Sequence, residues 1–542
     1  MFNNQDSKSR KWHREAVVYQ IYPRSFMDAS GDGVGDLRGI IEKLDYLNDG
    51  TEKSLGVEVV WLSPIYKSPM ADFGYDISDY YEIDPLFGTM EDFDELVEEI
   101  HKRGMKIIMD FVPNHTSIEH PWFIESRSSK NNPKRDWYVW KDPKPDGSSP
   151  NNWLSVFGGS VWELDSKTGQ YYLHTFVKNQ PDLNWRNQDV KDAMLDVLEF
   201  WLHKGVDGFR TDAIYHLIKD DQFRNDPPNP NYVLGKDSPY DALLHVYSQG
   251  RPEIFDTTNG FCEILGRHDG KFMVSEAYLD LPEMSKMYKA CLHKVHAPFN
   301  FNLIYLPWIA DVYRKFIDDL EKILDEDEWP NYVLGNHDRH RVATRLGEER
   351  IRSMAMILLT LRGMPFIYYG DEIGMQNVHI PPDRVQDPWE KQTSGMGFGR
   401  DPERTPMQWS GDEHAGFSET EPWLPVGSDY KKVNVKTGFR DPTSLLSLYR
   451  KLIQYRKKSP ALLSGIYRSF DAGNKDVLAF VRESTEESIM VVVNFSSDEQ
   501  IAHIDVENGV IVCNTFLDAD EGGSISLKQL NLRPNEGYVV RV

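Results

Sequence analysis

Short apolar runs alternate with longer amphipathic segments along most of this chain. Eight runs have the length and composition of buried strands, at 17–22, 57–62, 105–111, 206–209, 272–275, 299–303, 332–334 and 364–369. Between them, segments such as 190–203 repeat apolar residues at helical spacing, and Gly205 ends that segment. Strands that alternate with helices predict an α/β fold, the (β/α)8 TIM barrel, with its site at the C-terminal strand ends. A doubly wound open sheet is the alternative.

Two stretches are too long to be ordinary connections between strands and helices. Residues 115–187 are rich in Asn, Pro, Ser and Trp, which predicts an inserted, loop-rich domain after the third strand. Residues 376–435 form a second loop-rich insertion. We expect its aromatic residues to wall a pocket above the barrel: Trp389, Phe398, Trp409, Phe417 and Trp423.

The end of the chain has a different pattern. After a predicted helix over 443–457, short runs with alternating apolar residues follow, and these indicate a C-terminal antiparallel β-sandwich. The predicted domains are therefore a barrel formed by 1–114 and 188–460, an inserted domain at 115–187 and a sandwich at 461–542.

Composition and charge exclude several kinds of partner. With 40% hydrophobic residues, the chain can bury a substantial core. Its formal net charge of -24 argues against nucleic acid and anionic membrane surfaces, so a neutral small molecule fits better, although charge also serves solubility. The chain shows no signal-peptide core and no apolar run near the roughly 20 residues that a spanning helix needs. Cys262, Cys291 and Cys513 lack paired or metal-type spacing, and these features together predict a cytoplasmic protein.

Three successive strand candidates end in a carboxylate. Asp212 follows the run that begins at Gly208, Glu276 follows 271–275, and Asp338 follows 332–337. Arg210 lies two residues before Asp212, so both side chains are expected on one face of the strand. A single Arg–Asp pair of this kind is commonly a structural salt bridge. Three carboxylates at neighbouring strand ends predict one active site.

Several motifs occur in a specific order along nearly the whole chain. They are Asp-Phe-Val-Pro-Asn-His at 110–115, the segment 208–216, Glu-Ala at 276–277, Asn-His-Asp at 336–338 and Gly-Met-Pro-Phe-Ile-Tyr-Tyr-Gly at 363–370. In this the chain resembles the α-amylase superfamily, glycoside hydrolase family thirteen. Gln-Pro-Asp-Leu-Asn-Trp at 180–185 is similar to the segment typical of the oligo-1,6-glucosidase and α-glucosidase branch.

The resemblance implies a retaining mechanism with two carboxylic groups about 5 to 5.5 Å apart. By match to the family motifs, Asp212 is the nucleophile, Glu276 the acid/base, and Asp338 a ligand of sugar hydroxyls. We expect Arg210 to lower the pKa of Asp212, while burial or neighbouring carboxylates keep Glu276 protonated. The resemblance also implies that the two motif histidines, His115 and His337, donate hydrogen bonds to the sugar.

Further positions match residues that determine which end of a sugar chain is bound. Asp72 and Tyr75 match residues that bind and stack on the terminal glucose, and Arg400 matches the arginine that pairs with that aspartate. Such a pair closes the pocket and implies exo-action on short oligosaccharides, although it could equally pin two loops together. Four residues just past the catalytic positions are expected near the leaving sugar: Tyr215, His216, Arg339 and His340.

The expected activity is that of an α-glucosidase with possible transglucosylation. Ala213 occupies the position where relatives that cleave α-1,6 bonds usually carry valine, which favours α-1,4 over α-1,6 linkages. The alternatives are an oligo-1,6-glucosidase and a sucrose-directed isomerase or glucosyltransferase of the same fold. A non-catalytic binding subunit is disfavoured because all three carboxylates are present. A monomer or small homo-oligomer is expected.

A loop near the start of the chain places oxygen-bearing residues at every second position. The twelfth position is Gly39 and the closing glutamate is missing, which excludes an EF-hand. In the glycosidase branch that the chain resembles, the same loop binds one structural calcium or magnesium ion. The implied ligands are the side chains of Asp28, Ser30, Asp32 and Asp36 and the carbonyl of Val34. The alternative is a metal-free loop of Asx turns.

Overall fold

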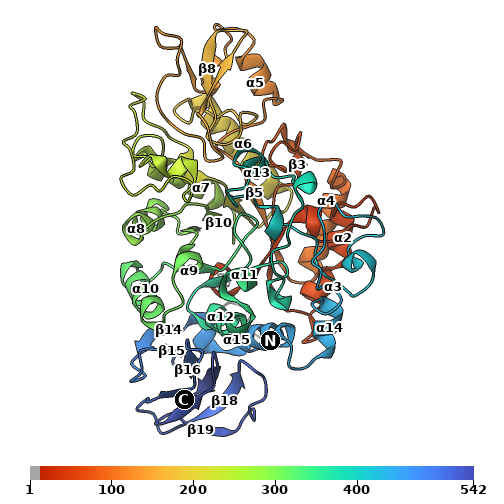
Figure 1. The fold of residues 1–542 in the computed structure, drawn as a ribbon, viewed down its shortest axis with the longest axis vertical. Coiled ribbons are helices and arrows are strands. Elements are labelled where there is room, and N and C mark those ends of the chain that lie inside the picture. The colour runs from red at the N-terminus through yellow and green to blue at the C-terminus, as the bar shows by residue number, and fades with distance from the viewer. Residues whose placement is uncertain (1–11) are drawn as a thin grey trace, which may run out of the picture.

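The computed structural model describes residues 12–542, and its centre is a barrel of parallel strands (Figure 1). Eight strands form one sheet in the order β11-β10-β9-β5-β2-β1-β13-β12, and β11 and β12 lie at its two edges. The strands are β1 (Val18–Ile21), β2 (Val59–Leu62), β5 (Lys106–Phe111), β9 (Gly208–Thr211), β10 (Phe272–Ser275), β11 (His296–Pro298), β12 (Asn331–Val333) and β13 (Met364–Tyr368). This nearly closed order confirms the predicted barrel and not the open sheet.

Helices surround the barrel because its strands are buried on both faces and must be covered. The longer ones are α4 (Met90–Lys102), α6 (Gln188–His203), α7 (Glu253–Leu265), α8 (Leu281–Ala290), α10 (Ala310–Ile323), α12 (Glu348–Thr360) and α15 (Leu445–Lys458). Helix α6 shows how the sequence sets such an element. The Asn187 side chain accepts a hydrogen bond from the backbone N–H of Asp189 at its start, and Gly205, with φ of 96°, follows its end.

The sixth strand lies before the segment predicted for it. Strand β11 ends at Pro298, whereas the apolar run at 299–303 consists of irregular chain followed by the first residues of the short helix α9 (Asn302–Tyr305). The run is apolar because Phe299, Phe301 and Leu303 are buried at the end of the barrel. Burial by loop contacts therefore imitates a strand pattern here.

The two ends of the molecule carry further elements (Figure 1). Within 115–187, the helix α5 (Pro121–Ser126) accompanies an antiparallel sheet of β6 (Trp140–Lys141), β8 (Gln170–Leu173) and β7 (Trp162–Asp165). Residues 376–435 contain the short helix α13 (Pro388–Gln392) and 3-10 turns. The inserted segment with α5 and β8 lies at one end of the molecule, and the last strands lie at the opposite end.

The C-terminal region is antiparallel, as predicted. Its six-stranded sheet contains β14 (Ile466–Phe470), β15 (Val477–Glu483), β16 (Ser488–Asn494), β21 (Gly537–Arg541), β18 (Asn508–Asn514) and β19 (Ser524–Ser526). The pair β17 (Gln500–Ala502) and β20 (Leu530–Leu532) packs on one face of this sheet, in a core that includes Val492 and Val540. The other face, with Leu478 and Val491, joins the main core of the barrel.

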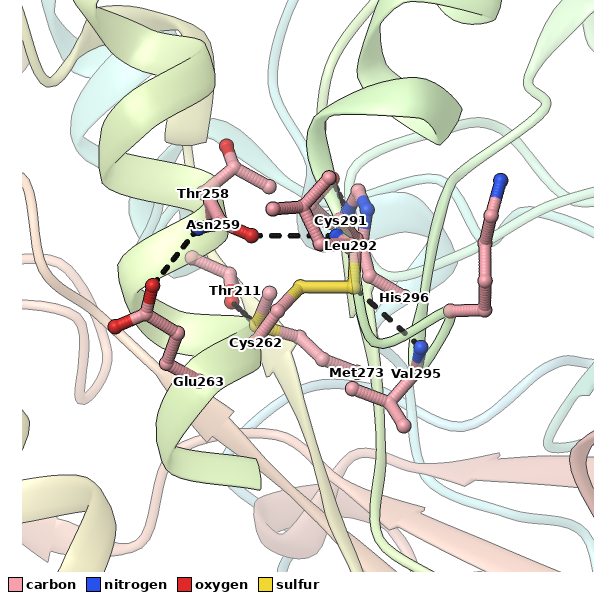
Figure 2. Close-up of a disulfide and its surroundings, with 12 residues drawn as sticks. Thr211, Thr258, Asn259, Cys262, Glu263, Met273, Cys291, Leu292, Val295 and His296 are labelled. Atoms are coloured by element: carbon pink, nitrogen blue, oxygen red, sulfur yellow. Dashed lines mark hydrogen bonds between the residues drawn. A yellow bond between two sulfur atoms is a disulfide. The ribbon is translucent and has the colours of Figure 1, made fainter. Parts of the chain in front are cut away.

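A disulfide links helix α7 to the end of helix α8, contrary to the sequence interpretation. Cys262 in α7 is bonded to Cys291, which directly follows α8, and both residues are fully buried (Figure 2). Cys513 is free and buried. The cysteine spacing therefore does not support a reducing cytoplasm, and the cytoplasmic location stays a prediction. Within residues 12–542, no helix combines the length and apolar character needed to cross a membrane.

Candidate active site

The three predicted carboxylates line one cavity at the C-terminal end of the barrel strands. Asp212 follows β9, Glu276 follows β10, and Asp338 follows β12 after a short turn. The cavity has a volume of about 560 Å³. Parallel strands point their C-terminal ends the same way, so residues that are distant in sequence converge at one rim.

Arg210 holds the carboxylates together from beneath the cavity. Its Nη1 lies 2.7 Å from Asp212 Oδ1 and 2.5 Å from Asp110 Oδ1, and its Nη2 lies 2.5 Å from Glu276 Oε2. The guanidinium is buried and does not line the cavity, so the structure places it as a bridge between carboxylates rather than at the wall. Because Asp212 and Glu276 bond to the two terminal nitrogens of one guanidinium, their spacing is compatible with the roughly 5 Å of retaining glycosidases.

The pKa of Asp212 differs from the sequence expectation. Burial raises this pKa, Arg210 lowers it, and the charges of Glu276 and Asp110 raise it again, so that the pKa lies well above its ordinary value. Arg210 thus lowers the pKa as expected, but burial and the two neighbouring carboxylates outweigh it, so the expected net lowering is wrong. Asp212 and Glu276 contact the same guanidinium and are therefore held next to each other. Two adjacent carboxylic groups are what retention requires, one to attack as a carboxylate and one to donate a proton.

Asp338 has the opposite electrostatic surroundings. Its Oδ1 lies 3.1 Å from Arg400 Nη1 and 2.8 Å from Arg404 Nη2. Burial raises the pKa of Asp338, but His337, Arg400 and Arg404 outweigh it and hold the pKa below its ordinary value. Asp338 is therefore an ionised hydrogen-bond acceptor for hydroxyl groups in the cavity.

The residue after Asp212 has an uncommon backbone conformation. Ala213 has φ of 43° and ψ of 35°, in the left-handed region that favours glycine. This turn directs the backbone N–H of Ala213 toward Glu276 Oε2, at 3.3 Å. Such conformations cost free energy and concentrate at functional sites, where surrounding structure imposes them.

Part of the cavity wall is built by a loop that the Asp76 side chain holds in place. The Asp76 carboxylate accepts hydrogen bonds from the backbone N–H groups of Ala71 and Asp72. Asp72 then meets Arg400, with Nη2 to Oδ1 at 2.7 Å, and both line the cavity. Tyr75, from the same loop, also lines the cavity. The predicted Asp72–Arg400 pair is therefore formed, across 328 residues of chain.

The two motif histidines occupy different places. His115 lines the cavity, and its Nε2 lies 3.1 Å from the carbonyl oxygen of Tyr75. His337 lies behind Tyr75, with its Nε2 2.6 Å from the Tyr75 hydroxyl and its Nδ1 2.8 Å from Gln20 Nε2. His337 is not among the residues that line the cavity, so its predicted contact with sugar stays a prediction.

Aromatic side chains make up much of the remaining wall. The rings of Trp389 and Phe398 stack at 5.8 Å, and Trp389 stacks at 5.2 Å on Phe157 from the inserted segment. The pocket-wall prediction is therefore right for Trp389 and Phe398. Sequence reasoning missed five aromatic wall residues because only tertiary contacts place them: Phe157, Phe176, Tyr240, Tyr278 and Tyr305.

Besides Arg210 and His337, four other residues expected at the pocket do not line the cavity. Trp409 is buried against Phe26, to whose carbonyl its indole N–H donates, and Phe417 and Trp423 lie outside the cavity wall as well. His340 is turned away and lies 3.1 Å from Glu403, whereas Tyr215, His216 and Arg339 line the cavity as expected.

The predicted metal loop is held by its own hydrogen bonds. The Asp28 carboxylate accepts from the backbone N–H groups of Gly31 and Gly33 and from the Ser30 and Ser418 hydroxyls. The Asp36 carboxylate caps α2 (Leu37–Glu42) and accepts from Ala29 and Ser30.

Among the described residues, no three His, Cys, Asp or Glu side chains are arranged to hold a metal ion. The hard oxygen donors suit calcium or magnesium, but the hydrogen bonds fit the metal-free alternative equally. Metal binding therefore stays a prediction.

Comparisons with known proteins agree with this geometry. The chain matches the alpha amylase catalytic domain family over residues 20–465. It is 40% identical to an oligo-1,6-glucosidase of Parageobacillus thermoglucosidasius, covering 98% of this chain and 99% of that one, and 37% identical to an alpha-glucosidase of Culex pipiens, covering 98% and 91%.

Solved structures are similar over the same span. The alpha-glucosyl transfer enzyme XgtA is 38% identical, with a TM-score of 0.89, covering 98% of this chain and 99% of that one. A variant of the trehalulose synthase MutB is 36% identical, with a TM-score of 0.88, covering 98% and 100%. This chain thus belongs to the α-amylase family of glycoside hydrolases.

Proposed function

We propose that this protein is a retaining, exo-acting α-glucosidase that releases terminal non-reducing glucose from short oligosaccharides. One observation carries the proposal. Asp212 and Glu276 share the guanidinium of Arg210, and they line one cavity together with the Asp72–Arg400 ion pair. The carboxylates supply the chemistry, and the ion pair sets which end of the substrate enters.

The chemistry follows from the two protonation states of the carboxylate pair. The Asp212 carboxylate attacks the anomeric carbon, and Glu276 donates its proton to the departing glycosidic oxygen. A glucosyl ester of Asp212 and a free alcohol result. Glu276, now ionised, takes a proton from water, which attacks the same carbon and restores the Asp212 carboxylate. Two inversions give net retention.

Arg210 and Asp338 assist from fixed positions. Arg210 stabilises whichever member of the pair is ionised, because it contacts both at once. Asp338, kept ionised by Arg400 and Arg404, accepts hydrogen bonds from sugar hydroxyls and stabilises positive charge that develops on the sugar ring.

Exo-action follows from the Asp72–Arg400 pair, which is almost fully buried on both sides. Gln180 Nε2 also lies 3.2 Å from Asp72 Oδ2, so the pair is held within a network. A sugar chain cannot continue past this wall. Only a terminal glucose can therefore reach Asp212.

For linkage we favour α-1,4 over α-1,6 bonds, on the small side chain of Ala213 beside the nucleophile. The second candidate is an oligo-1,6-glucosidase, which the name of the Parageobacillus thermoglucosidasius relative favours. A sucrose-directed isomerase or glucosyltransferase is a third, since trehalulose synthase has a similar structure. Transfer to an alcohol in place of water uses the same ester intermediate.

The test compares glucose release from maltose, isomaltose and sucrose by the wild type and three variants. Asp212→Asn should abolish turnover of every substrate. Glu276→Gln should lose a larger fraction of its turnover on maltose than on p-nitrophenyl α-glucoside, because the leaving group of the latter needs little protonation. Asp241→Asn is the matched control, because Asp241 lines the same cavity.

Turnover by Asp212→Asn at the wild-type rate would remove the nucleophile assignment. Faster release from isomaltose than from maltose would select the oligo-1,6-glucosidase. A first product in the β-anomeric form, measured by NMR, would exclude retention.

A further inference from the structure

Behind the cavity wall lies a buried polar chain that no step of the proposed mechanism uses. It consists of Lys219, Asp182 and Asn114, and it ends on the ring of His115. All four residues are at most 5% exposed. Buried polar groups of this kind persist when every member is hydrogen bonded, and they then fix one arrangement.

The amide of Asn114 has a single orientation in this chain. Its Oδ1 accepts a hydrogen bond from Lys219 Nζ at 2.9 Å, and its Nδ2 donates to Asp182 Oδ1 at 3.2 Å. Lys219 Nζ also lies 2.6 Å from Asp182 Oδ2. Reversing the amide would place a nitrogen against an ammonium and an oxygen against a carboxylate, so the charges hold the amide in place.

The second hydrogen of the Asn114 amide points to His115. Asn114 Nδ2 lies 3.1 Å from His115 Nδ1. Burial lowers the pKa of His115 to about 4, so the ring is neutral near pH 7 and carries one N–H only. Because Asn114 can only donate here, Nδ1 must accept, and the single ring hydrogen lies on Nε2.

His115 makes two further polar contacts, both at its Nε2 atom. Nε2 lies 3.1 Å from the Tyr75 carbonyl oxygen, which requires a hydrogen on Nε2, and 3.0 Å from Gln180 Nε2, which disfavours one. A hydrogen on Nε2 thus produces one unfavourable contact. A hydrogen on Nδ1 would produce two, at Asn114 and at Tyr75.

We infer that Lys219, Asp182 and Asn114 are positioning residues that fix the Nε2–H tautomer of His115, so that this histidine presents a hydrogen-bond donor to the glucosyl unit. The inference rests on the proposed function for the role of His115. The charges of Lys219 and Asp182 fix the orientation of the Asn114 amide. The amide in turn donates to Nδ1 of His115, which leaves the ring hydrogen on Nε2. The Nε2–H lies 3.1 Å from the Tyr75 carbonyl oxygen, and a sugar hydroxyl that approaches Nε2 shares this hydrogen with that carbonyl in a three-centre hydrogen bond.

The direct test is the ¹⁵N NMR spectrum of histidine-labelled protein at pH 7, with His115 assigned by difference from His115→Gln. We expect an Nε2–H tautomer in the wild type. In Asn114→Asp, where a carboxylate accepts from the ring, the tautomer should change to Nδ1–H. Asn331→Asp is the matched control, because Asn331 is another fully buried asparagine that donates to a carbonyl, and it should leave His115 unchanged.

Kinetics supply the second readout, using p-nitrophenyl α-glucoside and its monodeoxy analogues. For the hydroxyl that His115 contacts, Asn114→Asp should lower kcat/KM by about tenfold to a hundredfold, the effect of one lost hydrogen bond in a buried site, and should change little for the matching deoxy analogue. Where Asn114→Asp does not fold, Lys219→Met removes the charged anchor and takes its place.

An Nδ1–H tautomer in the wild type would overturn the inference. So would an unchanged tautomer in both folded variants. The NMR result does not depend on turnover, so an inactive enzyme with the expected tautomer would count against the proposed function and not against this inference.

Discussion

Removal of the Cys262–Cys291 disulfide should lower the stability of the barrel by a calculable amount. The bond closes a loop of about 30 residues, with a sequence separation of 29. In the chain-entropy treatment, a loop of that length stabilises the folded state by roughly 3.5 kcal/mol at 25 °C. With an unfolding entropy of about 2.1 cal/mol/K per residue, a chain of this size should lose about 3 °C in Tm.

The assay is differential scanning calorimetry of the wild type and of the Cys262→Ser, Cys291→Ser double variant, each with and without dithiothreitol. The variant and the reduced wild type should unfold at similar temperatures, below the oxidised wild type. Cys513→Ser is the matched control, because Cys513 is buried and free. Three titratable thiols in denatured, unreduced wild type would refute the reasoning, as would a double variant with an unchanged Tm.

Three more predictions concern charged groups. Arg400→Ala leaves the buried carboxylates of Asp72 and Asp387 without their ion-pair partner, while Asp338 keeps Arg404, and the variant should lose about 3 to 5 kcal/mol of unfolding free energy, measured by urea denaturation. Arg384→Ala, at an exposed ion pair, should lose less than about 1 kcal/mol. Burial raises the pKa of Asp371 to about 7, so the folded state binds a proton that the unfolded state releases, and stability should fall as pH rises from about 4 to about 7. Asp371→Asn should reduce the dependence of stability on pH and should raise the denaturation midpoint at pH 8. An equal pH dependence in both proteins would contradict the raised pKa of Asp371. If the predicted metal loop at 28–36 binds an ion, EDTA should lower the Tm of the wild type and calcium should restore it, with no such response in Asp32→Ala. A wild-type Tm that EDTA does not change would favour the metal-free loop.

The sequence was sufficient for the elements whose pattern is set locally. Helix α6, predicted at 190–203 with Gly205 at its end, is observed at Gln188–His203, and the strand ends converge because parallel strands share one direction. The Asp72–Arg400 pair could be predicted only through family resemblance, since no local pattern connects residues 328 positions apart. Periodicity alone would have left these two residues unrelated.

What the sequence did not reveal depends on packing in three dimensions. The apolar residues at 299–303 are buried by loop contacts and do not form a strand. Trp409 packs against Phe26 and does not line the cavity. The pKa of Asp212 depends first on its burial and then on the charges of Arg210, Glu276 and Asp110, and two neighbouring residues of a sequence reveal neither. The Cys262–Cys291 bond was missed because spacing along a chain carries little information about distance between helices.

Under the proposed exo-action, the Asp72–Arg400 pair closes one end of the cavity, and this closure sets the order in which the contents of the cavity leave. Substrate, departing alcohol, attacking water and released glucose must all pass through the same opening. The alcohol has to leave before water can approach the ester on Asp212, and glucose, seated deepest, leaves last. Free glucose therefore competes with fresh substrate for the innermost position, and the wall that gives the enzyme its choice of chain end also makes it sensitive to its own product.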